Sequence, residues 1–301
     1  MVGIERGVES EKARQSARHR LFVEGSKSSI DSQVLKTFFT ENEINIRVEP
    51  LAHSLNIRTV AQALYPYHPD YYFLIDRDHH NDEIVESCWN NFPDENTHNL
   101  LIWRRREIEN YFLIPEYLAR SPHCQCSLDA LQQCIRETAS KRVFLDIANI
   151  VILQLRAELK KDWVEPFKDT GTTEFSRRDK ALAKLMEKHE TAKQTCDVLE
   201  KLREYPISDR FNKTIDEFFG DDQNELEFGC GSWLKMIRGK RVLRVVIDKC
   251  FRVKDATGKY LQGDERCMEV VKSLLKLPLE DQPGDFNELY KLISARVSKR
   301  T

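Results

Sequence analysis

Three acidic residues follow two apolar segments that have the composition of buried strands. Residues 21–24 end in Glu24, and the apolar residues 71–75 lead directly into Asp76 and Asp78. In an open parallel sheet the ligand crevice lies beyond the carboxyl ends of the strands, so we expect the three side chains to converge there. Carboxylate oxygens are hard ligands that favour Mg²⁺ or Mn²⁺ over zinc. The pattern therefore predicts a site for a divalent metal ion.

A cluster of this kind suits the cleavage of phosphodiester bonds. That reaction needs neutralisation of the phosphate, a nucleophilic water and stabilisation of the leaving oxygen, and a divalent ion supplies all three. Glu24 is the candidate base, because the charges of Asp76 and Asp78 would raise its pKa. A lone Asp-x-Asp after a strand is weak evidence, since Asp also caps turns and helices. The combination with Glu24 is the stronger signal.

The elements that must position these acids alternate along residues 20–119. Apolar runs predict strands, and helical spacing of apolar residues between them predicts helices. Alternation of this type predicts right-handed crossovers and a mainly parallel α/β sheet flanked by helices. The predicted strands are residues 21–24, 44–48, 71–76 and 99–103, and the predicted helices are residues 31–41, 57–65 and 82–89.

Beyond residue 121 the sequence predicts helices in place of strands. One of them, residues 177–203, carries a heptad-like apolar stripe that includes Leu182, Leu185 and His189. Such a stripe fits either a partner-binding arm or a helix that faces the core. The predicted helices of this part are residues 128–138, 142–163, 177–203, 209–219, 241–251, 265–275 and 285–297.

The composition is that of an ordinary folded protein. The chain has 301 residues, of which 41% are hydrophobic and 32% charged, and its net charge of −2 does not by itself indicate a nucleic-acid binder. Residues 1–19 lack the apolar run of a signal peptide, so we expect a cytoplasmic protein. We divide the chain into a polar segment (1–19), a catalytic α/β domain (20–120) and a mostly helical C-terminal domain (121–301) for dimerisation or for binding a partner or substrate.

The chain has eight scattered cysteines and one sequence cluster of them, in which Cys124 and Cys126 are followed by Cys134. A structural zinc site usually has a Cys-x2-4-Cys knuckle and a second pair of ligands further along, and neither feature is clear. In a chain without a secretory signal we expect reduced thiols. The sequence alone therefore favours buried or incidental cysteines over a zinc site.

The strand-end acids in this order resemble the TOPRIM domain of topoisomerases, primases and the overcoming-lysogenization-defect (OLD) nucleases. The resemblance covers about residues 20–118 and implies a Rossmann-like TOPRIM sheet. In such domains the glutamate after the first strand serves in acid/base chemistry or metal binding, which corresponds to Glu24. The Asp-x-Asp after the third strand binds the divalent metal, which corresponds to Asp76 and Asp78.

Two further segments resemble the OLD-like branch of that family. Residues 106–111, Arg-Glu-Ile-Glu-Asn-Tyr, are similar to its Arg-x-Ile-Glu-Asn-Tyr signature, and Gly239-Lys240 looks like a Gly-Lys element found late in such proteins. A free-standing nuclease of this branch with a helical tail is similar to the AriB-type effectors of PARIS anti-phage defence. That resemblance implies a toxin-like endonuclease that uses Mg²⁺ or Mn²⁺, cuts host tRNA as a homodimer and is held inactive by an AriA-like ABC/OLD ATPase.

One departure from the family pattern concerns the fourth acid. OLD-type sequences commonly place an Asp four residues after the strand-end Glu, whereas this chain has Ser28 there and Asp31 as the next acid. Asp31 either reaches the metal from the start of the helix or only caps that helix. Whether Glu109 joins the metal site is also open. Tyr111 is a candidate nucleophile, but packing or substrate contact is the better interpretation.

Two groups of basic residues could contact phosphates. One follows the fourth predicted strand, and the other surrounds Gly239. Arginine suits phosphate recognition, but such groups also occur in solvated turns and on ordinary helix surfaces. We assign nucleic-acid binding to Arg104, Arg105, Arg106, Lys240 and Arg241.

Two other functions fit some of the same residues. In a haloacid-dehalogenase-type phosphatase, Asp76 would accept the phosphoryl group and Asp78 would be its acid partner, although that fold usually carries Asp-x-Asp on its first strand. A degenerate TOPRIM fold could also serve as a non-catalytic interaction module. The presence of Glu24 together with both aspartates favours an enzyme.

Overall fold

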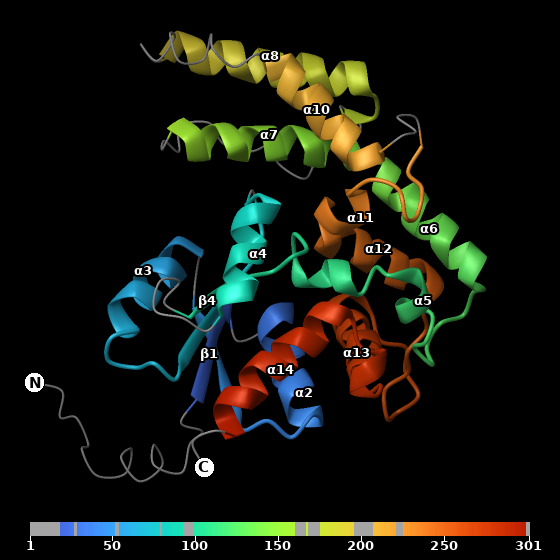
Figure 1. Cartoon of the computed structure of the whole chain (residues 1–301). Helices are drawn as coiled ribbons and strands as arrows, with labels where there is room; N and C mark the ends of the chain where they lie inside the picture. Colours follow the sequence, from blue (N-terminus) through green and yellow to red (C-terminus); the bar gives the residue numbers. More distant parts are fainter. Residues whose placement is uncertain are drawn as a thin grey trace, which may run out of the picture.

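A four-stranded, all-parallel sheet lies at the centre of the computed structural model (Figure 1). The structure describes residues 19–26, 29–51, 54–78, 80–92, 99–159, 167, 175–195, 207–220 and 225–298. The strand order is β2-β1-β3-β4, and the predicted α/β class is confirmed. The strands are β1 (His19–Glu24), β2 (Ile46–Leu51), β3 (Tyr71–Ile75) and β4 (Leu100–Ile102).

Three helices connect the strands as crossovers: α2 (Ile30–Glu41), α3 (Ser54–Leu64) and α4 (Asp82–Asn91). Helix α2 packs on β1 and β2, α3 packs on β1 and β3, and α4 packs on β4. Right-handed crossovers in this strand order put α2 and α3 on opposite faces of the sheet, as Figure 1 shows on either side of β1. Ser29 caps α2 by accepting from the Ser32 backbone N–H, and Asn81 caps α4.

The rest of the described chain is helical, as predicted. Each of the long helices lies within a few residues of its predicted bounds, although residues 160–163 and 196–203 of two predictions lie outside the described residues. The long helices are α6 (Leu128–Ser140), α7 (Val143–Leu159), α8 (Arg178–Thr195), α10 (Ile207–Phe219), α12 (Gly239–Cys250), α13 (Gly263–Leu275) and α14 (Gly284–Ser298). The short ones, which the sequence analysis did not predict, are η1 (Ile108–Tyr111), α5 (Pro115–Leu118), α11 (Trp233–Met236) and η3 (Leu279–Asp281).

The sheet and the C-terminal helices share one hydrophobic core. Phe286 of α14 packs against Phe38 of α2, against Trp103 just after β4 and against Tyr111 of η1. The cluster of buried apolar residues runs without a break from the strands to α14. The division at residue 120 into two domains stays a prediction, and the packing shows that the two parts are not separate cores.

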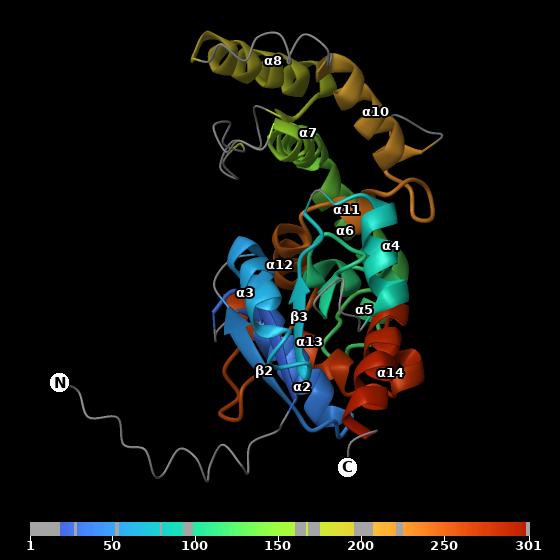
Figure 2. The same ribbon diagram turned by 60° about the vertical axis from the view of Figure 1, so that its left-hand side comes forward.

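Helices α7, α8 and α10 pack on one another and form a layer beyond the sheet and its flanking helices (Figures 1 and 2). On α8, Leu185 is buried and Leu182 is partly buried against the core, which agrees with a core-facing stripe for this part of the helix. The side chain of His189 lies outside the described residues. None of the described helices is both long and apolar enough to cross a lipid bilayer.

A buried ion pair ties α7 to the segments that surround the sheet edge. Asp146 of α7 is fully buried, and its two carboxylate oxygens accept hydrogen bonds of 2.8 Å from Arg142. The same carboxylate accepts from the Arg238 backbone N–H at 3.0 Å and lies 3.7 Å from the guanidinium of Arg106. One carboxylate therefore joins α7, the segment after β4 and the start of α12.

Replacing Asp146 with Ala is expected to lower the free energy of unfolding by about 3–5 kcal/mol, because Arg142 and Arg106 lose their buried counter-charge. Urea unfolding of the wild type and the variant measures this loss. The control is Asp179→Ala, which removes an exposed ion pair with Arg177 of 3.2 Å and should cost less than about 1 kcal/mol. Equal, small losses in both variants would show that the buried pair contributes no more than a surface pair.

Candidate functional site

Glu24 and Asp76 meet at the carboxyl edge of the sheet. Strands β1 and β3 are parallel neighbours, so the end of β1 lies beside the end of β3. The backbone N–H of Asp76 donates a 3.1 Å hydrogen bond to the Glu24 carboxylate. The structure thus brings together two of the three acids that the sequence analysis placed at this edge, and it fixes them by a direct contact.

Asp78 completes the Asp-x-Asp pair from a turn with unusual backbone geometry. Its φ of 47° lies in the left-handed region, which Asp tolerates better than most residues but which still carries strain. Glu24 is close enough to Asp78 for the aspartate's charge to act on it. Burial, followed by the charge of Asp78, raises the pKa of Glu24 to about 7. All three predicted catalytic acids therefore belong to one electrostatic cluster.

Asp31 joins this cluster and does not cap its helix. The cap of α2 is Ser29, while Asp31 lies in the first turn. Burial, together with the charge of Glu107, raises the pKa of Asp31 to about 6. The charge of Asp31 in turn acts on Asp76. Asp31 thus lies beside the other acids and not at the capping position, and its part in holding a metal ion stays a prediction.

Glu107 and Glu109 bring the segment after β4 to the same edge. Glu109 is buried, and burial with the charges of Asp31 and Glu107 raises its pKa well above the usual range. Burial and the charges of these neighbours likewise raise the pKa of Asp76 well above its usual range. Glu107 was not singled out from the sequence as a site residue, although it lies in the segment that resembles the OLD-like signature.

The donor set fits Mg²⁺ or Mn²⁺ in its chemistry. Six carboxylates repel one another at this edge, and a hard divalent cation would relieve that repulsion. In the part of the chain that the structure describes, no group of three or more His, Cys, Asp or Glu side chains is spaced to hold an ion as it stands. Binding at this edge would therefore require carboxylate side chains to turn toward the ion. The carboxylates are Glu24, Asp31, Asp76, Asp78, Glu107 and Glu109.

The start of α12 docks on the segment that carries these glutamates. Glu107 accepts a 2.9 Å hydrogen bond from the Lys240 backbone N–H, and Asn110 donates to the carbonyl oxygens of Leu234 and Ile237 at 3.1 and 2.8 Å. Gly239 lies directly against Asn110. The side chain of Lys240 is exposed, and its charge lowers the pKa of Asp31 and Glu109. The two segments that resembled the OLD-like branch thus meet in space.

Arg104 lies within a network of structural ion pairs. Its guanidinium donates to Glu86 at 2.9 Å, to Asp285 at 3.1 Å and to Glu288 at 2.6 Å. It also lies 4.3 Å from the ring centre of Trp89. These contacts hold α4 and α14 to the end of β4. Phosphate binding by Arg104 stays a prediction, and this geometry supports a structural role instead.

The other predicted phosphate-binding residues have mixed surroundings. Arg106 is buried against Asp146, and Arg105 stacks on the ring of Tyr111 at 5.3 Å. Lys240 and Arg241 are exposed at the start of α12. Of the five basic residues that we assigned to nucleic acid, these last two are therefore the better placed to meet a phosphate backbone, and their role stays a prediction.

Tyr111 is part of the core. Its hydroxyl donates to Asp285, and its ring packs against Trp103 and Phe286. Burial, with the charge of Asp285, raises its pKa well above the usual range. A buried hydroxyl that already has an acceptor is poorly suited to attack phosphate, which agrees with the packing interpretation.

Arg58 of α3 lies near the acids, and the sequence analysis did not identify it. It contacts His80 at 2.5 Å, and its charge lowers the pKa of Glu24. Burial lowers the pKa of Arg58, while the charges of Asp78 and Glu24 act in the opposite direction. Only the position of Arg58 in the helix after the second strand could have indicated a place near this edge.

Comparison of the chain with protein-family models, with curated proteins and with solved structures found no match. The TOPRIM, OLD-like and PARIS resemblances rest on the residues and motifs of the chain alone.

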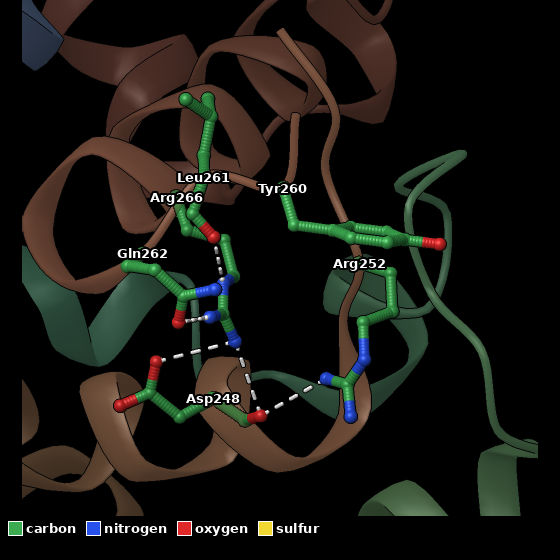
Figure 3. Close-up of a pocket in the computed structure, with 6 residues that line it drawn as sticks. All are labelled: Asp248, Arg252, Tyr260, Leu261, Gln262 and Arg266. Carbon is green, nitrogen blue, oxygen red and sulfur yellow. Dashed lines mark hydrogen bonds and ion pairs between the residues drawn. The ribbon is translucent and has the colours of Figure 1, made fainter. Parts of the chain in front are cut away.

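A pocket of about 470 Å³ lies at the other end of α12 (Figure 3). Its two arginines are directed at acceptors of the protein itself: Arg266 donates to the carbonyl oxygens of Leu261 and Asp248, and Arg252 donates to that of Asp248. None of the predicted site residues is among its lining residues. These are Asp248, Arg252, Tyr260, Leu261, Gln262 and Arg266.

The acid cluster should make the metal-free protein less stable as the pH rises. Folding raises the pKa of Asp31 from 3.8 to about 6. Between these values the folded state binds more protons than the unfolded state, so stability falls with rising pH. We expect Asp31→Asn to be more stable than the wild type at pH 8 by on the order of 1–2 kcal/mol, with the gain shrinking toward pH 4.

Urea unfolding in the presence of a chelator at several pH values measures this gain. The matched control is Asp129→Asn, an exposed aspartate in the first turn of α6, which should show no gain at pH 8. If Asp31→Asn changed the stability equally at pH 4.5 and pH 8, burial of its charge would not be the cause.

Gly239 should be intolerant of a side chain. A Cβ there would lie 2.4 Å from Asn110 Oδ1 and 2.8 Å from the Asn110 backbone nitrogen. We expect Gly239→Ala to lower the free energy of unfolding by about 1–3 kcal/mol. Gly284→Ala is the matched control at the first residue of α14, where a Cβ meets nothing within 4 Å. Thermal unfolding compares them, and equal tolerance of both would contradict the close docking of α12.

Proposed function

We propose that this chain is a divalent-metal-dependent TOPRIM-type endonuclease. The observation that carries the proposal is the convergence, at the carboxyl edge of a parallel sheet, of acids at the end of β1 and after β3 with those of α2 and η1. Ligand sites of open α/β sheets lie at this edge. A cluster of this many carboxylates is unfavourable by itself, because the negative charges repel one another. A bound cation that also contacts a phosphate group would give the cluster a function.

The residues of the chain have distinct parts in this proposal. Glu24 is the proposed proton acceptor for the attacking water, since its carboxylate is oriented by the Asp76 backbone N–H. Asp76, Asp78 and Asp31 are the proposed metal ligands, together with Glu24. Bound Mg²⁺ or Mn²⁺ would neutralise the scissile phosphate and make the water more nucleophilic.

Lys240 and Arg241 are the proposed contacts to the nucleic-acid backbone. They lie at the start of α12, whose docking on Glu107 brings Lys240 beside the acids. An ammonium group there can meet a phosphate oxygen without entering the metal site. The assignment of Arg104, Arg105 and Arg106 is weaker, because these side chains are less exposed than those of Lys240 and Arg241.

The biological setting of the proposal rests on the resemblance to AriB-type effectors. It comprises a cytoplasmic, toxin-like nuclease of PARIS anti-phage defence that cuts host tRNA. An AriA-like ABC/OLD ATPase would hold it inactive, and the active form would be a homodimer. The Arg-x-Ile-Glu-Asn-Tyr-like segment and Gly239-Lys240 support this choice within the TOPRIM nucleases.

Incubation of the purified chain with total tRNA, plasmid and single-stranded DNA tests the proposal. We expect cutting that requires Mg²⁺ or Mn²⁺, that stops with a chelator and that favours tRNA. Glu24→Gln and Asp76→Asn should each reduce the rate by at least about 100-fold. Asp129→Asn, on the exposed start of α6, is the control that should keep full activity. Circular dichroism confirms that each variant is folded.

Three other outcomes would contradict the nuclease. Absence of cutting with every substrate and metal would remove its main support. Turnover of small phosphomonoesters that needs Asp76 would instead identify a haloacid-dehalogenase-type phosphatase. Partner binding that survives the loss of Glu24 and Asp76, without any uptake of metal, would identify a non-catalytic interaction module.

A further inference from the structure

Four cysteines from three segments of the chain converge at the end of α12. Cys124 and Cys126 lie in the loop before α6, Cys134 lies on α6, and Cys250 is the last residue of α12. The structure therefore adds Cys250 to the three cysteines that form the sequence cluster. None of the four forms a disulfide bond.

The thiols form a continuous chain of contacts. The sulfur atoms of Cys124 and Cys126 are 3.8 Å apart. The thiols of Cys126 and Cys250 lie close enough to affect each other's pKa, and the thiol of Cys134 acts on that of Cys250 in the same way. Contact among four thiols from three separate segments is not expected from random placement of cysteines in a core.

The separation of one pair of these sulfurs, Cys124 and Cys126, matches that of neighbouring ligands in a tetrahedral thiolate site. Four thiolates around Zn²⁺ at about 2.3 Å have neighbouring sulfurs about 3.8 Å apart. The Cys124–Cys126 distance has this value. The Cys-x-Cys pair is tighter than the usual Cys-x2-4-Cys knuckle, so the other two ligands must come from elsewhere in the fold, as Cys134 and Cys250 do.

Main-chain contacts hold the three segments in place. The backbone N–H of Gln125 donates to the Cys250 carbonyl at 2.9 Å, and that of Arg252 donates to the His123 carbonyl at 3.1 Å. Cys124 also forms an antiparallel bridge with Phe251. The loop is thus fixed against the end of α12 by backbone geometry, and the thiols are brought together on a prepared frame.

We propose that Cys124, Cys126, Cys134 and Cys250 bind one structural Zn²⁺ ion. Thiolates are soft ligands that favour zinc over Mg²⁺ and Mn²⁺, so this site is chemically distinct from the acids at the sheet edge. In the described residues neither the thiols nor those acids are already spaced to hold an ion. Zinc binding would therefore require the cysteine side chains to rotate toward the ion. Cys134 and Cys250 are buried while Cys124 and Cys126 are partly exposed, which gives an ion a route of entry.

The expected effect of the ion is to fasten α6 and α12 together. These helices pack along each other, and the proposed ligands join them where α12 ends. The other end of α12 begins at Gly239 and Lys240 beside the carboxylates. This inference does not depend on the proposed nuclease activity, because the site lies away from the acids and its occupancy is measured directly.

Metal analysis of the full chain, purified without chelator, tests the site. We expect about one zinc ion per chain by mass spectrometry of the metal content. Replacement of the zinc with Co²⁺ should give the strong visible absorption of tetrahedral thiolate coordination. Cys124→Ser and Cys126→Ser, at the two partly exposed positions, should reduce the zinc content to near zero while the chain remains folded by circular dichroism.

The matched controls are Cys230→Ser, at an exposed position, and Cys267→Ser, at a buried one. Both should keep the zinc, and loss of zinc in them to the same degree would contradict the assignment of the four ligands. Two other results would overturn the proposal. One is no zinc in the purified chain, with neither Zn²⁺ nor Co²⁺ bound on titration of the reduced protein. The other is a disulfide between any two of the four cysteines in a metal-free protein isolated under cytoplasmic redox conditions.

Discussion

The parallel direction of the four strands is the constraint on which this structure depends. Because every strand ends at the same edge, the residues at and after the strand ends are crowded there, and in this chain they include the carboxylates of Glu24, Asp76 and Asp78. The resulting repulsion and burial appear as raised pKa values at Glu24, Asp31, Asp76 and Glu109. A fold chosen for stability alone would place apolar or basic residues at this edge. The large apolar core offsets the cost of acids here.

The start of α12, which is distant in the sequence, packs at the carboxyl edge of the sheet. Asn110 and Glu107, just after β4, hold the start of α12 through its backbone. Asp146 adds a second tie, since its carboxylate reaches both Arg106 and the Arg238 backbone. The carboxyl edge therefore takes its final form only when the helical half has packed on the sheet. Removal of that half would expose both the core and the acid cluster.

Much of the fold could be predicted from the sequence, because hydrophobic periodicity survives wherever an element packs on one core. Strand β2 begins two residues later than predicted and includes Pro50, which is tolerated because β2 is an edge strand with a partner on one side only. The proximity of Glu24 and Asp76 could be predicted, because both come at the carboxyl ends of strands in a parallel sheet. The partners of Arg104 could not be predicted, since Asp285 and Glu288 lie on a helix whose docking no local pattern reveals. Cys250 was missed as a neighbour of Cys124 for the same reason.

Helix α12 connects two regions of opposite chemical character. Its first turn lies against hard, oxygen-rich side chains at the sheet edge, and its last residue lies among soft thiols. A helix is stiff along its axis, so a constraint at one end limits the tilt of the other. An ion at the thiols would thereby restrict the position of Lys240 without touching the carboxylates. Such an arrangement would let the fold hold a basic side chain beside a repulsive acidic cluster, with the proposed site for oxygen-seeking ions at one end of the helix and the proposed zinc site at the other.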